Sequence, residues 1–222
     1  VKEKSKTVNT TSNAVNNNAE QALLLTRSRL DKAFIEHYPN DEKSLTLAVQ
    51  QAQYSFDNKN NEMLQYYSDF ILQTHGVIAG AKHNGRVSEK VINHAEISAN
   101  LSPKARKEIQ TASQLQANNW YQQGQYFQAE KWYNLALNYV AINSAFWLKM
   151  RELLAASIYF QGKNLVSSQP LLAAEHYLRL GKQVPESSYR LSAHFDAANI
   201  LLAQQHWQEA VGVLLTFQKR YP

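Results

Sequence analysis

A repeated spacing of aromatic and small residues in the second half of the chain limits its possible folds more than any other feature. Residues 124–137 read GQYFQAEKWYNLAL, and residues 205–217 read QHWQEAVGVLLTF. In each segment an aromatic residue stands three positions before an alanine, a larger residue follows four positions after it, and a further core candidate follows at seven. Residues at this spacing share one face of an α-helix, and an alanine there lets a second helix approach closely. The pattern therefore predicts closely packed pairs of helices.

The composition agrees with a helical chain. Only 7 Gly and 5 Pro occur among 222 residues, and 44% of the residues are hydrophobic. Few turn-forming residues favour helices over a sheet of many strands, and strand patterns are nearly absent. We therefore predict an all-α protein, built as one ordinary domain or one short superhelix.

Start and stop signals place the expected helices. Asp41 and the pair Ser102-Pro103 are expected to begin helices, since Asp and Ser cap N-termini and Pro suits the first turn. The expected helices run from Ala19 to Tyr38, from Asp41 to Phe56, over Met63–Ile71 and Val87–Ala99, and over residues 103–122, 125–140, 144–162, 169–182, 187–204 and 206–219. A loose segment, Val77–Gly85, interrupts this series.

Three regions follow from this pattern. Residues 1–19 are rich in Asn, Thr and Ser, so we expect a flexible linker there. Residues 20–102 are expected to be an N-terminal helical region with one degenerate helix pair, in which Met63 occupies the place of the key alanine. Residues 103–222 are expected to contain about three better-formed helix pairs.

The helix pairs resemble the tetratricopeptide repeat (TPR), whose period is about 34 residues. The corresponding alanines, Ala129, Ala173 and Ala210, are separated by 44 and 37 residues, so at least one first helix should be extended. The resemblance implies a right-handed superhelix of antiparallel helix pairs, a TPR-like α-solenoid. It also implies that Trp120, Tyr126, Tyr133, Tyr177 and Trp207 pack between helices as core residues.

In TPR proteins the first helix of each pair lines the concave face. Transferring that register predicts protein-binding positions at Gln114, Asn118, Tyr121 and Gln122, and at Phe195 and Asn199 in the last pair. The two asparagines could hydrogen-bond an extended peptide backbone, or they could simply be solvated. The family's two-carboxylate clamp needs a lysine where this chain has Gln114, which argues against binding the C-terminal tails of chaperones.

No enzyme signature occurs in the sequence. The seven histidines form no close metal-ligand pair, cysteine is absent, and no Gly-rich phosphate loop or nucleophile elbow is present. We therefore expect no catalytic residues, no metal and no cofactor. No stretch is apolar enough to span a membrane, and the net charge of +5 is not concentrated in a patch of the kind that binds nucleic acid.

Residues 129–222 resemble TPR proteins of the bacterial cell envelope. The resemblance rests on LLAASIYFQG, AAEHYLRLGKQVPESS and the closing FQKRYP, which is similar to TPR endings in outer-membrane β-barrel-assembly lipoproteins and the Tol-system coordinator. It implies a non-enzymatic scaffold that binds protein or peptide partners in the periplasm or at the outer membrane. A cytosolic adaptor that binds peptides or a transcription factor, and a regulatory domain of a larger enzyme or transporter, remain alternatives.

The last expected helix carries apolar residues that no later segment covers. These are Val211, Leu214, Leu215 and Phe217. Repeat arrays need a polar cap at each end. We therefore expect either that another repeat follows or that this edge pairs with another chain, for example in a dimer.

Overall fold

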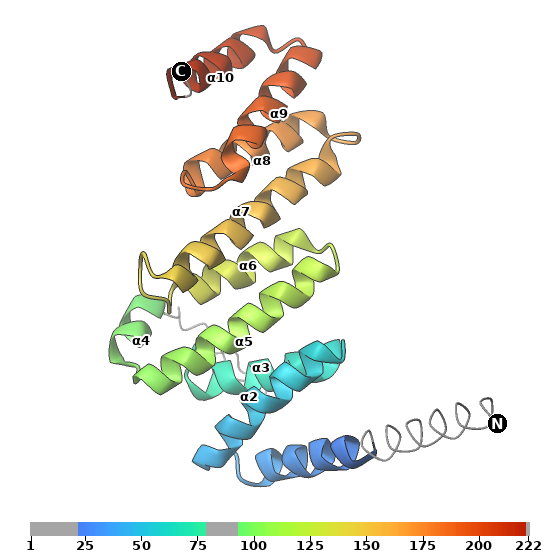
Figure 1. Cartoon of the computed structure of the whole chain (residues 1–222), viewed down its shortest axis with the longest axis vertical. Coiled ribbons are helices and arrows are strands. Elements are labelled where there is room, and N and C mark those ends of the chain that lie inside the picture. Colours follow the sequence, from blue (N-terminus) through green and yellow to red (C-terminus); the bar gives the residue numbers. More distant parts are fainter. Residues whose placement is uncertain (1–21, 79–92, 221–222) are drawn as a thin grey trace, which may run out of the picture. The chain divides into compact units, whose positions relative to one another are not determined.

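The computed structural model of the chain describes residues 22–78 and 93–220, and it is helical through most of these residues, with no strand among them (Figure 1). This confirms the all-α prediction. The chain divides into two compact units, residues 1–71 and residues 72–222. The linker expected at residues 1–19 lies outside the described residues, and the division into repeats at residue 103 stays a prediction.

The first unit contains a helix at residues 22–37, then α2 (Glu42–Asp57) and most of α3 (Asn61–Thr74). Asp41 caps α2 as predicted, because its carboxylate accepts a hydrogen bond of 2.8 Å from the Lys43 N–H. Gln51 of α2 is buried and connects to the preceding helix. Its side chain accepts a hydrogen bond from the Ser28 hydroxyl and donates one of 2.7 Å to Asp31.

The second unit is a succession of helices. They are α4 (His94–Asn100), α5 (Pro103–Gln122), α6 (Tyr126–Leu137), α7 (Ala145–Leu165), α8 (Pro170–Gln183), α9 (Tyr189–Ala203) and α10 (Trp207–Arg220). From α5 onward each helix packs against the next one, and neighbouring helices run in opposite directions (Figure 1). From α5 onward the bounds agree with the expected ranges to within about three residues. The helix expected over Val87–Ala99 is described only from His94 onward, because residues 87–92 lie outside the described part of the chain. The expected extended first helix is α7, which has 21 residues.

The predicted start of α5 is confirmed. The Ser102 hydroxyl accepts a hydrogen bond of 3.1 Å from the Ala105 N–H, and Pro103 occupies the first turn. The Ser102 hydroxyl satisfies a backbone donor that would otherwise lack a partner at the helix N-terminus, and Pro103 has no N–H that needs one. Ser102 and Pro103 therefore fix the residue at which α5 begins.

Three turns between helices share one backbone geometry. In each turn one residue has a left-handed conformation, with φ of 56° at Lys59, 73° at Gly124 and 62° at Gln205. The following N–H then bonds to the carbonyl five residues earlier, from Asn60 to Ser55, from Gln125 to Trp120 and from His206 to Leu201. This is the Schellman closure of a helix C-terminus. The turn between α7 and α8 is longer and differs from these three.

The shared turn geometry corrects the register of the first pair. Five residues after each left-handed residue stands Leu64 in α3, Ala129 in α6 and Ala210 in α10, and all three are fully buried. Leu64, and not Met63, therefore corresponds to the key alanine, so the predicted position was wrong by one residue. The α2–α3 pair has a leucine in place of the small residue.

Small residues bring the helices of the second unit close together. Gly162 of α7 faces Tyr177 of α8, and a β-carbon at residue 162 would lie 2.9 Å from Tyr177 Cε1. Ala129 and Ala173 are fully buried in the same core. The core therefore depends on close backbone approach as well as on large side chains.

The predicted core positions are confirmed for most of the aromatic residues and wrong for Trp207. Tyr133 and Tyr177 are buried, and Trp120 packs against the core. Trp207, however, is 57% exposed. Its counterpart Tyr126 is covered by the next helix, α7, whereas α10 is the last helix that the structure describes.

Candidate protein-binding face

The candidate face is formed by α5, α7 and α9, the first helices of the three pairs in the second unit. Tyr121, in the last turn of α5, packs edge-on against Tyr126 with ring centroids 5.2 Å apart. It also packs edge-on against Phe160 of α7 at 6.1 Å. Phe160 in turn stacks on Tyr126 at 5.2 Å with 25° between the ring planes. These contacts join α5, α6 and α7 through aromatic rings.

Tyr159 continues the ring contacts toward α8 and α9. Its ring lies 5.1 Å from that of Tyr177 and 5.3 Å from that of Tyr189, the first residue of α9. Its hydroxyl donates a hydrogen bond of 2.7 Å to the Asp196 carboxylate on α9. The hydrogen bond fixes the orientation of the Tyr159 ring relative to α9.

We refer to these rings as the aromatic band. Its members are Tyr121, Tyr126, Tyr159, Phe160 and Tyr189, and each is half-buried. Half-buried tyrosines present an apolar ring together with a polar hydroxyl, the combination that is enriched at protein interfaces. Because neighbouring rings hold each side chain in place, a partner would find a preorganised apolar surface.

The hydroxyl groups of two members of the band, Tyr121 and Tyr159, stay protonated at neutral pH. Burial, together with the nearby hydroxyls of Tyr189 and Tyr126, raises the pKa of Tyr121 to about 12. Burial and the hydrogen bond to Asp196 raise the pKa of Tyr159 above its ordinary value of 10.0. Tyr121 and Tyr159 are therefore neutral phenols and not phenolates.

The structure places the predicted α5 residues in different surroundings. Tyr121 belongs to the aromatic band, Gln122 is exposed beside it, and Gln114 is half-buried. The side-chain oxygen of Asn118 accepts a hydrogen bond of 2.8 Å from the hydroxyl of the buried Tyr133. Asn118 thus already has a partner inside the fold, which leaves less of its amide available for a peptide.

The predicted α9 residues lie on the surface. Phe195 is 55% exposed, and Asn199, one helical turn later, is exposed as well. Both flank Asp196, the acceptor for Tyr159, so they lie near the end of the aromatic band that reaches α9. Helix α7 contacts α9 directly, and its rings connect Tyr121 on α5 with this region through Phe160 and Tyr159.

Sequence reasoning missed the contribution of α7. Tyr159, Phe160 and Tyr189 were not among the predicted site residues. A signal was present, because Trp120-Tyr121-Gln122 near the end of α5 matches Tyr159-Phe160-Gln161 in α7. These triplets are 39 residues apart, whereas Ala129 and Ala173 are 44 apart, so five extra residues lie between α7's triplet and α8. Counting back from Ala173 with the spacing of the α5–α6 pair would therefore give the wrong register for α7.

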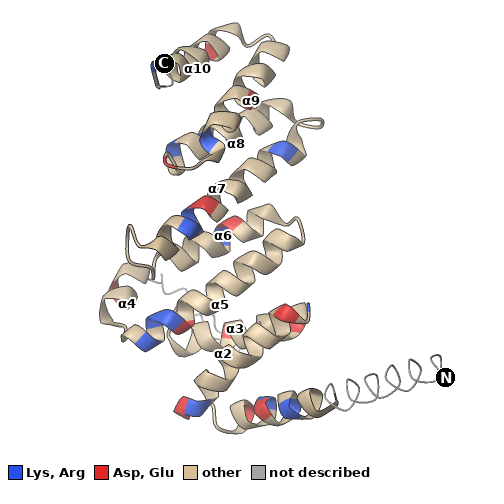
Figure 2. Cartoon of the chain, in the orientation of Figure 1, with Lys and Arg blue, Asp and Glu red and all other residues tan. Residues whose placement is uncertain are grey.

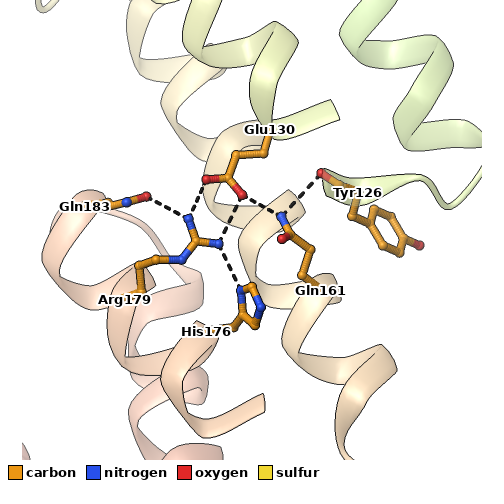
Figure 3. Close-up of polar contacts among 6 residues, drawn as sticks. All are labelled: Tyr126, Glu130, Gln161, His176, Arg179 and Gln183. Carbon is orange, nitrogen blue, oxygen red and sulfur yellow. Dashed lines mark hydrogen bonds and ion pairs between the residues drawn. The ribbon is translucent and has the colours of Figure 1, made fainter. Parts of the chain in front are cut away.

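A buried polar cluster meets the band at Tyr126, whose backbone carbonyl accepts a hydrogen bond from Gln161 (Figure 3). Glu130 of α6 is almost fully buried and accepts hydrogen bonds from Arg179 of α8, at 2.5 and 3.1 Å, and from Gln161 of α7, at 2.7 Å. Arg179 also donates to His176 Nδ1 at 2.9 Å. The cluster therefore connects α6, α7 and α8 through a single carboxylate. It also holds Gln161, the residue that follows Phe160.

The charges in this cluster are mutually satisfied. Burial alone would raise the pKa of Glu130, but the hydrogen bonds from Arg179 and Gln161 outweigh it, and the pKa falls below its ordinary value of 4.5. Burial and the neighbouring Arg179 lower the pKa of His176. His176 is therefore neutral and accepts the hydrogen bond through Nδ1. A carboxylate paired with an arginine in this way holds helices together and is poorly suited to accept a proton from a substrate.

Other chemical groupings are sparse in the part of the chain that the structure describes. Among those residues no group of three or more His, Asp or Glu side chains could hold a metal ion. No described helix is both long and apolar enough to cross a membrane. Figure 2 shows basic and acidic residues interspersed along the helices. Most acidic groups near the band already have partners, as Glu186 does with Arg151 at 2.6 Å.

Comparison with known proteins gave no relative. No family model matches the chain, and no characterised protein or solved structure is significantly similar to it.

Proposed function

We propose that this chain is a non-enzymatic helical-repeat scaffold that binds other proteins through the face formed by α5, α7 and α9. The observation that carries this proposal is the aromatic band, whose half-buried rings cross all three of these helices. The repeated turn geometry and the packing of each helix on the next support a TPR-like, right-handed superhelix. In such an arrangement the first helices share one face, where partners bind.

The partner class follows from the chemistry of this face. The aromatic band, the exposed Phe195 and the amides of Gln122 and Asn199 suit a protein surface or an extended peptide. Apolar rings would contact apolar side chains, and the amides would hydrogen-bond the peptide backbone. Within the part of the chain that the structure describes, the charges in Figure 2 are interspersed and form no basic stripe of the kind that nucleic acids need.

We place the scaffold in the bacterial cell envelope, in the periplasm or associated with the outer membrane. The resemblance of residues 129–222 to envelope TPR proteins supports this location, and the absence of cysteine is compatible with an oxidising compartment. This location predicts that the partners captured by the scaffold are envelope proteins, which can be tested separately from the binding face.

Site-specific photo-cross-linking in native cells tests the binding face. A photoreactive phenylalanine analogue replaces Phe195 in one full-length variant and Phe127 of α6 in the other. The two positions are matched, since Phe195 is 55% and Phe127 58% exposed. We expect the Phe195 variant to cross-link a defined set of envelope proteins, identified by mass spectrometry, and the Phe127 variant to give background only.

Three outcomes would count against the proposal. Equal cross-linking at both positions would show that partners do not prefer this face to the surface of α6 around Phe127. Absence of cross-linking at Phe195 would show that partners do not bind at the face formed by α5, α7 and α9. Cross-linking of cytosolic proteins at Phe195 would keep the binding face and overturn the location.

A further inference from the structure

Helix α10 has two apolar faces, and only one of them is covered. Ala210 is fully buried and Val213 packs against the core of the second unit. The adjoining face carries Trp207, Val211, Leu214 and Leu215, all exposed. We call these four residues the outer face of α10. They stand at positions i, i+4, i+7 and i+8, so they form one contiguous stripe along the helix.

Helix α6 shows what covers such a face. The shared turn geometry aligns Tyr126, Glu130 and Tyr133 of α6 with Trp207, Val211 and Leu214 of α10. In α6, the next helix, α7, covers two of these positions, with Phe160 stacked on Tyr126 and Gln161 hydrogen-bonded to Glu130, and the third, Tyr133, is fully buried. A helix is therefore the element that fits this face. Because Val211 replaces Glu130, a helix that covers α10 needs an apolar side chain where α7 has Gln161.

The spacing along α10 matches a second copy of the same helix. Trp207, Val211, Leu214 and Gln218 are separated by four, three and four residues, the spacing of a coiled-coil seam. This spacing reads the same from either end. An antiparallel copy therefore comes into register, with Val211 facing Leu214 of the other copy and Trp207 facing its Gln218. All four side chains are uncharged, so no like charges meet at the two-fold axis.

We propose that the outer face of α10 is a homodimer interface, in which two copies of α10 pack antiparallel around a two-fold axis between Val211 and Leu214. This inference does not depend on the proposed binding face, which lies on other helices. Because one helix from each copy forms the seam, the dissociation constant should be roughly 1–100 µM, as for small, transient interfaces.

Sedimentation equilibrium of the 222-residue chain between about 5 and 200 µM tests the dimer. We expect Leu214→Glu to weaken association at least about 30-fold, because the dimer would bury an unpaired carboxylate. Leu148→Glu on α7 is the matched control, since Leu148 is 50% and Leu214 39% exposed, and it should leave the dimer intact. Circular dichroism should show that both variants remain folded.

Disulfide trapping tests the orientation, since the chain contains no cysteine of its own. A mixture of Trp207→Cys and Gln218→Cys chains at about 200 µM should form a cross-linked dimer, whereas either variant alone should form little. In the antiparallel register equivalent residues 207 lie about 16 Å apart along the helix axis, too far for a disulfide.

Several results would overturn the proposal. One is a monomer throughout the concentration range. Another is a dimer that persists in Leu214→Glu, which would point to a different surface, such as the exposed Leu23 and Leu30 in the helix at residues 22–37. Rapid cross-linking of Trp207→Cys alone would contradict the antiparallel register.

Discussion

The imidazole ring of His194 on α9 lies directly against the backbone of Gly181 on α8. A β-carbon at residue 181 would come within 2.2 Å of His194 Cε1. The ring is held there because its Nδ1 lies 2.9 Å from the Arg190 carbonyl oxygen, and a carbonyl can only accept, so Nδ1 carries the proton and donates. Glycine is needed at this position because the two helices approach closely, and not because the backbone has an unusual conformation.

Gly181→Ala should therefore lower the free energy of unfolding by about 1–3 kcal/mol, because the added methyl group must displace the ring or separate the helices. Urea denaturation followed by circular dichroism measures this change. Gly212→Ala in α10 is the control, since no atom lies within 4 Å of a β-carbon there. It should raise stability by about 0.5–1 kcal/mol through helix propensity. A neutral Gly181→Ala would show that the ring moves aside without cost.

Gln205 has the left-handed conformation that Gly124 has in the equivalent turn, with φ of 62° and 73°. A side chain is strained at this φ, whereas glycine is not. We expect Gln205→Gly to raise the free energy of unfolding by about 1 kcal/mol, measured by urea denaturation. Gly124→Gln should lower it by a similar amount, and Gln204→Gly, at φ of −89°, should lower it slightly. Destabilisation by Gln205→Gly would contradict the described turn.

The hydrogen bond from Tyr133 to Asn118 allows the structural and binding roles of Asn118 to be separated. Tyr133→Phe removes the donor and should lower the free energy of unfolding by about 1 kcal/mol. Asn118→Ala should cost more, about 1–3 kcal/mol, because it leaves a buried hydroxyl without an acceptor. If Asn118 acts only within the fold, photo-cross-linking at Phe195 should be the same in Tyr133→Phe and in the parent protein. Loss of cross-linking in this variant would instead link Asn118 to the partner.

The helices could be predicted from the sequence because their signals are local. Ser102-Pro103 begins α5 through a side-chain cap and a fixed proline φ, and neither depends on distant residues. The spacing around Ala129 likewise reports a single helix face. Such local signals do not show how many residues form the turn before a helix. Met63 was therefore predicted as the counterpart of the key alanine, whereas the turn geometry identifies Leu64.

The candidate site was harder to predict because it depends on neighbouring helices. Tyr121 was predicted on the concave side of α5, but its contact with Phe160 could not be predicted without knowing the length of α7. Trp207 has the same local pattern as Tyr126, and its exposure differs only because α7 covers Tyr126. The pairing of Glu130 with Arg179 joins residues 49 positions apart, and no local pattern indicates it.

The Glu130 cluster gives a pH dependence with a definite sign. Hydrogen bonds from Arg179 and Gln161 lower the pKa of Glu130 below 4.5 in the folded protein, whereas the unfolded chain should have the ordinary value. A carboxyl group with a lowered folded pKa stabilises the fold above the unfolded pKa, and that stability is lost as the pH falls through the folded pKa. Glu130→Gln should therefore cost about 2 kcal/mol at pH 7. The difference from the parent protein should shrink from about pH 4.5 downward.

Urea denaturation of both proteins between about pH 7 and pH 3 measures this difference. His176 lies in the same cluster and its pKa is also lowered, so the comparison is best made in a His176→Asn background, where only residue 130 differs. Glu209→Gln is the control, since Glu209 is an exposed carboxylate on α10. It should change stability by less than about 0.5 kcal/mol across the range. A difference for Glu130→Gln that stayed constant down to pH 3 would mean that the carboxylate is not stabilised by Arg179.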